Sequence, residues 1–252
     1  MEHAKTNGQP FIHTAAQAMG LPEEQLEAFV AQYVDMQVLY RSAIREVSNR
    51  LEILDDEFQF RQKRNPIHHI QTRLKSPQSM MEKLGRRNLR PSVDVLRSEV
   101  TDIAGVRVVC SYVDDIYQLA ELLCAQEGVE LVRALDYIKR PKPGGYRSLH
   151  IVVTVPVHFS DGQHRVPVEI QIRTIAMDFW ASLEHELRYK TEAKITRDIV
   201  RELRDCADNI AELDERMQKI YHRLEAIEGN APHRADFWEK AKNGFGKGDA
   251  DA

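Results

Sequence analysis

The 252-residue sequence contains few cysteines and lacks any long apolar run. Its three cysteines, Cys110, Cys124 and Cys206, are far apart and form no CxxC pair, so we interpret them as small buried residues. No apolar stretch approaches the ~20 residues that a membrane-spanning helix needs, and no secretory signal peptide is evident. These absences exclude a membrane-spanning protein and predict a location in the reducing cytoplasm.

An excess of basic residues is also missing. Lys and Arg number 35 against 39 Asp and Glu, which gives a formal net charge of -4. The chain as a whole is therefore not expected to attract nucleic acid, and any site for a polyanion must arise from local clustering. The length, with 42% hydrophobic and 29% charged residues, suits one globular domain with helical appendages.

The pattern of apolar residues divides the chain into five parts. Residues 1–20 and 230–252 are polar or glycine-rich, which predicts disordered ends. Residues 21–64 repeat apolar side chains at three- and four-residue steps, which predicts an N-terminal helical region. Between residues 65 and 192, β-branched runs at 104–113, 129–138, 148–157 and 165–174 alternate with helical segments at 79–87, 114–128 and 175–189. This order predicts an α+β domain with a mixed sheet of four or five strands flanked by helices.

Residues 193–229 predict a long C-terminal helix with a heptad pattern. Apolar residues alternate there at three- and four-residue steps: Leu203, Cys206, Ile210, Leu213, Met217, Ile220, Leu224 and Ile227. Such a seam fits packing on the helix's own domain and contact with another subunit equally well.

A local polycation lies between Arg61 and Arg90, where Glu82 is the only acidic residue. Arg73 and Lys75 share a face if their segment is extended. The next candidates follow at steps of four and three, so they share a helix face: Ser79, Lys83 and Arg86. A hydroxyl, free amides and charges in this arrangement can surround a polyphosphate. A charged face that is merely exposed to solvent explains the same pattern equally well.

Two carboxylates stand in unusual β-strand contexts. Asp102 directly precedes a β-branched run, and Glu169 lies within another. An unpaired buried carboxylate is costly, and a divalent metal such as Mg²⁺ would offset that cost. Glu169, Gln171 and Arg173 alternate, so one strand face is polar, which is also usual for a solvent-exposed sheet face.

The segment "RPKPGGYRSLHIVV", residues 140–153, combines a turn with candidate ligand groups. A tyrosine displayed beside glycines, Tyr146, can stack on a nucleobase, and Lys142 and His150 can contact phosphates. A simple turn whose tyrosine caps the core explains this segment equally well.

Four motifs occur in order along the chain: "RLKSPQSMMEKLGRR", "DIAGVRVV", "DYIKRPKPGGYRSLH" and "VEIQIRTIAMDFWASLEHELRYK". From about Pro66 to Lys190 the chain resembles the synthetase domain of RelA/SpoT proteins, above all the small single-domain alarmone synthetases. The resemblance implies a nucleotidyltransferase-like fold and pyrophosphate transfer from ATP to the 3′-OH of GDP or GTP, giving AMP and ppGpp or pppGpp.

The same resemblance implies roles for the candidate residues. Two arginines would sandwich adenine: Arg73 and Arg107. Four residues would hold the ATP phosphates: Lys75, Ser79, Lys83 and Arg86. Asp102 and Glu169 would bind Mg²⁺, and Glu169 would also accept the proton of the attacking hydroxyl. The acceptor nucleotide would contact Lys142, Tyr146, His150 and Gln171, with Tyr146 stacked on guanine.

One position departs from the family pattern. Close small relatives carry an arginine directly before "DYI", where this chain has Leu135, with Arg133 two residues earlier. One contact to the acceptor phosphates is therefore in question. The preference between GDP and GTP stays open.

No "HD" dipeptide of the hydrolase domain occurs, so synthesis without hydrolysis is expected. The resemblance also implies a homotetramer and secondary binding of single-stranded RNA. Two alternatives remain: another polymerase-beta-like nucleotidyltransferase, which would release pyrophosphate, and a non-catalytic RNA-binding protein that uses the basic stretch.

Overall fold

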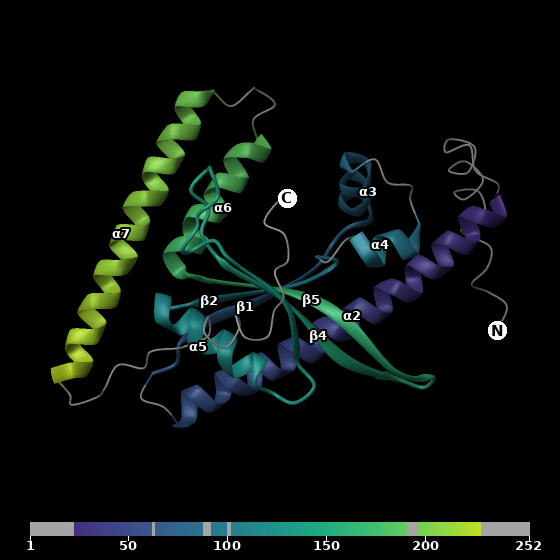
Figure 1. The fold of residues 1–252 in the computed structure, drawn as a ribbon, viewed down its shortest axis with the longest axis horizontal. Coiled ribbons are helices and arrows are strands. Elements are labelled where there is room, and N and C mark those ends of the chain that lie inside the picture. Colours follow the sequence, from purple (N-terminus) through teal and green to yellow (C-terminus); the bar gives the residue numbers. More distant parts are fainter. Residues whose placement is uncertain (1–22, 62–63, 88–91, 100–101, 191–195, 228–252) are drawn as a thin grey trace.

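The computed structural model describes residues 23–61, 64–87, 92–99, 102–190 and 196–227. The ends predicted to be disordered, 1–20 and 230–252, lie outside these residues. Within them, five strands form one sheet with helices around it (Figure 1). The predicted α+β class with a mixed sheet is confirmed.

The predicted strands and helices occur in the expected order, and the structure adds a strand before the first predicted one and a short helix at Val93–Glu99. In chain order they are α2 (Glu23–Arg61), β1 (Ile67–Leu74), α3 (Pro77–Arg86), α4 (Val93–Glu99), β2 (Ala104–Cys110), α5 (Val113–Cys124), β3 (Glu130–Asp136), β4 (Leu149–Phe159), β5 (Gly162–Thr174), α6 (Ile175–Lys190) and α7 (Arg197–Ile227). None of the helices in the described part of the chain is both long and apolar enough to span a bilayer.

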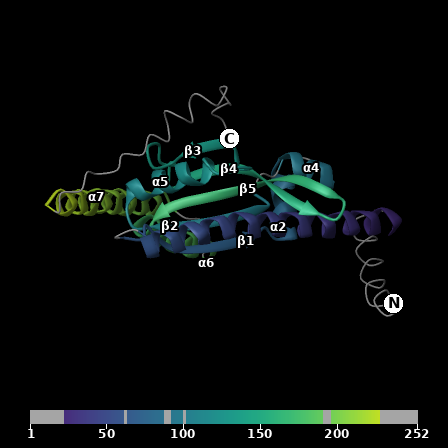
Figure 2. The same cartoon turned by 90° about the horizontal axis from the view of Figure 1, so that it is seen from below.

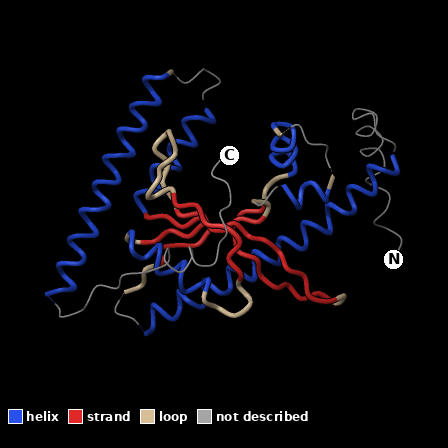
Figure 3. The backbone as a smooth tube through the Cα atoms, in the orientation of Figure 1, coloured by secondary structure: helices blue, strands red, loops and turns tan. Residues whose placement is uncertain are grey.

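The sheet has the strand order β1-β2-β5-β4-β3 and occupies the centre of the molecule (Figure 3). β2 and β5 run parallel, whereas the pairs β1–β2, β5–β4 and β4–β3 are antiparallel. The parallel register sets Gly105 beside Glu169 and Arg107 beside Gln171. Because Asp102 lies just before β2, this register brings the two predicted carboxylates to the same part of the sheet.

The sheet has one apolar and one polar face, and β5 shows both most clearly. Its residues Val166, Val168, Ile170 and Ile172 are buried in the main hydrophobic core. That core also contains the inward side chains of α2 and α5, and α2 runs along the sheet in both views (Figures 1 and 2). The alternate residues of β5 point to the opposite face, which α2 and α5 leave open.

The helix after β1 begins two residues earlier than predicted. Ser76 Oγ accepts a hydrogen bond from the Ser79 amide at 3.2 Å, so Ser76 is the N-cap of α3. Pro77 occupies the first helical position, where the N–H that proline lacks would have no partner in the helix. The prediction that this helix begins at Ser79 was therefore wrong. Ser79 lies within the first turn.

The C-terminal helix α7 lies beside α6 along one side of the molecule (Figure 1). The face that α7 turns to its own domain is partly polar, because Asp214 and Gln218 are both buried. The heptad seam is only partly covered: Leu203 and Ile210 pack beside buried Ala207. Its later members are largely exposed: Leu213, Met217, Ile220, Leu224 and Ile227.

Candidate active site

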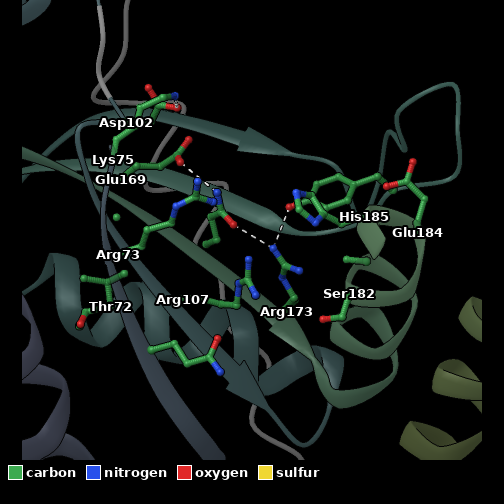
Figure 4. Close-up of a pocket in the computed structure, with 16 residues that line it drawn as sticks. Thr72, Arg73, Lys75, Asp102, Arg107, Glu169, Arg173, Ser182, Glu184 and His185 are labelled. Atoms are coloured by element: carbon green, nitrogen blue, oxygen red, sulfur yellow. Dashed lines mark hydrogen bonds and ion pairs between the residues drawn. The ribbon is translucent and has the colours of Figure 1, made fainter. Parts of the chain in front are cut away.

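A cleft of about 770 Å³ opens on the polar face of the sheet (Figure 4). The strands supply its floor, and α6 supplies Ser182, Glu184 and His185 on the opposite side. Residues that the sequence pattern selected from four separate segments line the cleft together: Arg73, Lys75, Asp102, Arg107, Tyr146, Glu169 and Gln171. The sheet register assembles them, because Arg73 pairs with Gly105 and Arg107 pairs with Gln171, so the odd-numbered residues in this part of β1, β2 and β5 share one face.

Asp102 forms two ion pairs at one end of the cleft. Lys75 Nζ donates to its Oδ2 at 2.6 Å, and Lys83 Nζ donates to its Oδ1 at 2.8 Å. Burial opposes ionisation of this carboxyl, but the hydrogen bonds and charges of both lysines outweigh it and hold the pKa of Asp102 below its usual range. Two cations therefore surround this carboxylate, which precedes β2: Lys75 from the segment after β1 and Lys83 from α3.

Glu169 lies at the middle of β5 and accepts hydrogen bonds on both oxygens. Gln171 Nε2 donates to Oε2 at 2.9 Å, and His150 Nδ1 lies 3.4 Å from Oε1. Burial opposes ionisation, yet His150 and Gln171 together lower the pKa of Glu169. Burial also lowers the pKa of His150, against the pull of Glu169. At neutral pH the site therefore holds a carboxylate beside a neutral imidazole.

The direction of these hydrogen bonds follows from Arg173, which can only donate. Arg173 Nη2 donates to the Tyr146 hydroxyl at 3.0 Å and to Gln171 Oε1 at 2.8 Å. The Tyr146 hydroxyl then donates to His150 Nε2, 2.8 Å away, so the proton of the neutral ring is on Nδ1 and faces Glu169. Both oxygens of Glu169 are thus connected to Arg173, one through Gln171 and one through Tyr146 and His150.

Of the predicted acceptor residues, Tyr146 and Gln171 line the cleft, whereas Lys142 and His150 lie beside Tyr146 without lining it. The Lys142 ammonium lies 5.2 Å from the centre of the Tyr146 ring and 4.5 Å from that of Tyr137. Tyr137 also meets His150 edge-on at 5.1 Å. Leu135, the position that departs from the family, pairs with His150 across β3 and β4 and therefore lies on the same sheet face.

Three of the six predicted ATP contacts do not line the cleft: Ser79, Lys83 and Arg86. Ser79 is engaged with Ser76, whose Oγ lies 2.9 Å from Ser79 Oγ. Arg86 lies exposed in the last turn of α3. Of the residues predicted on this helix, only Lys83 contacts a group that lines the cleft.

Arg173 lines the cleft and Asp178 pairs with it, although neither was predicted as a site residue. Asp178, in the first turn of α6, pairs with Arg173 Nη1 at 3.3 Å and Arg107 Nη1 at 3.6 Å. The Nε atoms of Arg107 and Arg173 are both buried without a hydrogen-bond partner among the described residues. The alternation of Arg173 with Glu169 and Gln171 was the available signal, whereas the link from α6 depends on tertiary packing.

This cleft has the chemical parts of an enzyme that acts on phosphorylated substrates. Cations stand at one end, an ionised carboxylate lies in the middle, and a tyrosine with a lysine lies at the other end. Such a site can neutralise polyphosphate charge and accept a proton from a hydroxyl. The fold and the site together define a phosphotransferase class.

Comparisons with known proteins give the family. A family model described as the region found in RelA and SpoT proteins matches residues 72–194. The GTP pyrophosphokinase YwaC of Bacillus subtilis is 37% identical over 197 residues, covering 78% of this chain and 94% of YwaC. The GTP pyrophosphokinase YjbM of the same species is also 37% identical, over 73% of this chain and 85% of YjbM.

Solved structures agree with the sequence comparisons. Small alarmone synthetase 1 from Bacillus subtilis, bound to its product pppGpp, superposes with a TM-score of 0.72 at 34% identity, covering 77% of this chain and 98% of that one. Small alarmone synthetase 2 of that organism gives 0.69 at 37% identity, covering 76% and 98%. The chain belongs to the RelA/SpoT family, among its small alarmone synthetases. The family and the enzyme class that the sequence motifs implied are confirmed.

Proposed function

We propose that this protein is a (p)ppGpp synthetase whose cleft holds ATP and a guanosine nucleotide side by side. The observation that carries the proposal is the single sheet face that joins the lysine-bound Asp102, the carboxylate Glu169 and the Tyr146 end of the cleft. The 3′ oxygen of the acceptor forms a bond to the β-phosphorus of ATP. The bond from that phosphorus to the oxygen of the α-phosphate breaks, AMP leaves, and Glu169 accepts the proton.

The ATP end is the end with Asp102. Arg73 and Arg107 are diagonal neighbours on adjacent strands, because Arg73 pairs with Gly105 and Arg107 pairs with Gln71. Planar guanidinium groups at this spacing suit the two sides of an adenine ring. Lys75 and Lys83 reach the phosphates from the same end. Ser79 and Arg86 remain predicted phosphate contacts at the edge of this site.

A divalent cation fits the donor set of the cleft. Asp102 and Glu169 supply two carboxylates, and the Asp102 charge acts on the pKa of Glu169. No group of three or more His, Cys, Asp or Glu side chains in the described residues could hold a metal alone. Mg²⁺ commonly needs only one or two carboxylates and takes its other ligands from substrate phosphates and water. When bound there, it supplies positive charge to the reacting phosphate oxygens.

The acceptor end is the end with Tyr146. Its ring stacks on guanine, Lys142 and His150 face the acceptor phosphates, and Gln171 completes the pocket. Glu169 is suited to accept the proton because its lowered pKa keeps it ionised at neutral pH.

We also propose that the protein is a homotetramer of the reducing cytoplasm. The exposed apolar seam of α7 supports subunit contact, since five large apolar residues remain open to solvent in the single chain. The three cysteines are free thiols, which suits a reducing compartment, although the expectation that all three are buried was wrong because Cys206 is exposed. Binding of single-stranded RNA stays a prediction.

The test of the reaction uses ATP labelled on its γ-phosphate, Mg²⁺, and GDP or GTP in turn. We expect label on a guanosine tetra- or pentaphosphate together with an equal amount of AMP, and the two rates rank the acceptors. Release of labelled pyrophosphate would instead identify another nucleotidyltransferase. Binding of RNA without turnover of any nucleotide would identify a binding protein.

A further inference from the structure

The segment that carries Tyr146 is held against α7, a helix outside the cleft. The Lys142 amide donates to the Tyr146 carbonyl at 3.1 Å, and the Gly145 amide donates to the Lys142 carbonyl at 2.8 Å. These bonds close a tight turn, which we call the acceptor loop (residues 142–148). Gly145 has a φ of +94°, a backbone conformation that glycine adopts without strain.

The acceptor loop approaches the backbone of α7 at Ala207. A Cβ atom placed on Gly145 would lie 2.6 Å from Ala207 Cβ and 3.4 Å from Arg204 Cα. Ala207 is 3% exposed, so the contact is closed to solvent. The spacing therefore needs a glycine on the loop and leaves room for no more than a small side chain at Ala207.

Arg147 joins the two segments with three hydrogen bonds. Its Nη1 donates to the Gly145 carbonyl at 3.1 Å and to the Ala207 carbonyl at 3.2 Å. Its Nη2 donates to Asp208 Oδ1 at 2.8 Å. A planar guanidinium can donate hydrogen bonds to the loop, the helix backbone and a carboxylate at the same time. The single ammonium group of lysine cannot make this arrangement of hydrogen bonds.

The Tyr146 ring connects this contact to the cleft. It packs against a small cluster of Trp180, Ala181 and Ala207. The Trp180 indole donates to the Leu203 carbonyl at 3.0 Å and so fixes α6 to α7. A hollow of only about 10 Å³ remains between the loop and the two helices. The far end of the ring, its hydroxyl, meets Arg173 and His150 in the cleft.

We propose that α7 positions the acceptor loop and that Arg147 and Ala207 are positioning residues for the guanosine nucleotide. The inference rests on the proposed function, since it assigns Tyr146 to the acceptor. The Asp208 carboxylate is 54% exposed, so its ion pair with Arg147 contributes little to stability, whereas the largely buried Arg147 also bonds the loop carbonyl of Gly145 and the helix carbonyl of Ala207. The main effect of losing Arg147 should therefore be on the position of Tyr146.

The test compares Arg147→Met with Arg201→Met. Arg201 lies on the same helix in an exposed pair with Asp198 at 3.4 Å, so it is a matched control. GDP is titrated calorimetrically in the presence of a saturating non-hydrolysable ATP analogue, and the analogue is titrated separately. For Arg147→Met we expect about tenfold weaker GDP binding, within the range of one base-stacking contact. Affinity for the ATP analogue should stay within twofold, Arg147→Lys should lie between, and Arg201→Met should match the wild type.

A second pair of variants tests the close approach itself. Gly145→Ala should weaken GDP binding, and Ala207→Gly added to it should restore part of the affinity, because the second change removes the methyl group that the first one meets. Unchanged GDP affinity in Arg147→Met, or an equal loss for both nucleotides, would overturn the positioning role. Because binding is measured directly, a wild type that binds GDP without making ppGpp would count against the proposed function alone.

Discussion

Glu169 receives hydrogen bonds on both carboxylate oxygens, and both connections lead back to Arg173. Removing its charge while keeping its shape therefore tests its role with little change in packing. We expect Glu169→Gln to lower kcat by about 10² to 10⁴, the usual contribution of a general base. Binding of GDP should stay within a few-fold. Near-normal turnover in this variant would exclude Glu169 as proton acceptor.

Tyr146 offers two separable properties, a ring face and a hydroxyl. Tyr146→Ala should raise the KM for GDP or GTP about tenfold or more, because stacking on a base contributes about 1–3 kcal/mol. Tyr146→Phe keeps the ring and loses only the bonds to His150 and Arg173, so its acceptor KM should change less. Steady-state kinetics with each substrate varied in turn give both values. Equal increases in the two KM values for Tyr146→Ala would contradict the stacking role.

Leu135 lies opposite His150 on the sheet face of the site. Leu135→Arg would bring a cation to the acceptor end, where the family resemblance implies one. We expect the acceptor KM to fall several-fold, with an ATP KM close to that of the wild type. Leu135→Met is the control for a long side chain without charge. If both variants behave alike, charge at this position has no part in acceptor binding.

At the scale of elements, α7 buries a carboxyl on the face that it turns to its own domain. Burial raises the pKa of Asp214 although Thr174 donates a hydrogen bond to it. A carboxyl whose pKa is raised by folding adds stability below its unfolded pKa, and that stability is lost as the pH rises through the folded pKa. Asp214→Asn should therefore raise the melting temperature at neutral pH and change it little near pH 4. Thermal unfolding at both pH values measures this, and a lower melting temperature at neutral pH would refute it.

Elements differ in how far the sequence could define them. The alternation of β5 predicted its two faces correctly, because a half-buried strand must separate apolar from polar side chains. β1 was not distinguished as a strand, because most of its residues are polar and its register is irregular between Ile67 and His69. The start of α3 was misplaced because Ser76 and Ser79 are both good caps by type, and only the backbone geometry selects Ser76.

The candidate site was predicted best where it follows strand alternation and least where it depends on packing between distant elements. Asp102, Glu169 and Tyr146 were selected from motifs that the structure brings into one cleft. The link of Asp178 to Arg107 and Arg173 connects α6 to two strands, and no local pattern encodes it. The spacing of apolar residues could not predict the orientation of α7 either, because its buried face includes Asp214 and Gln218 while apolar residues point outward.

At the scale of the whole molecule, the exposed seam of α7 predicts the assembly state. Met217→Glu combined with Leu224→Glu would place charges in an apolar contact between subunits. We expect smaller species by light scattering and an unchanged helical content by circular dichroism. Arg216→Glu, a charge change at an exposed position beside the seam, is the control and should keep the wild-type mass. An unchanged oligomer in the double variant would assign the contact to another surface.

The parallel pairing of β2 with β5 has a consequence for how the protein is made. These neighbours in the sheet are separated in the chain by α5, β3 and β4, so the contact between them closes a long loop. Long-range strand pairing forms slowly compared with local helices. While β5 is still inside the ribosome, the growing chain has Asp102 but no Glu169 beside it. Each new copy can therefore begin to make a signalling nucleotide only after most of its own synthesis is complete.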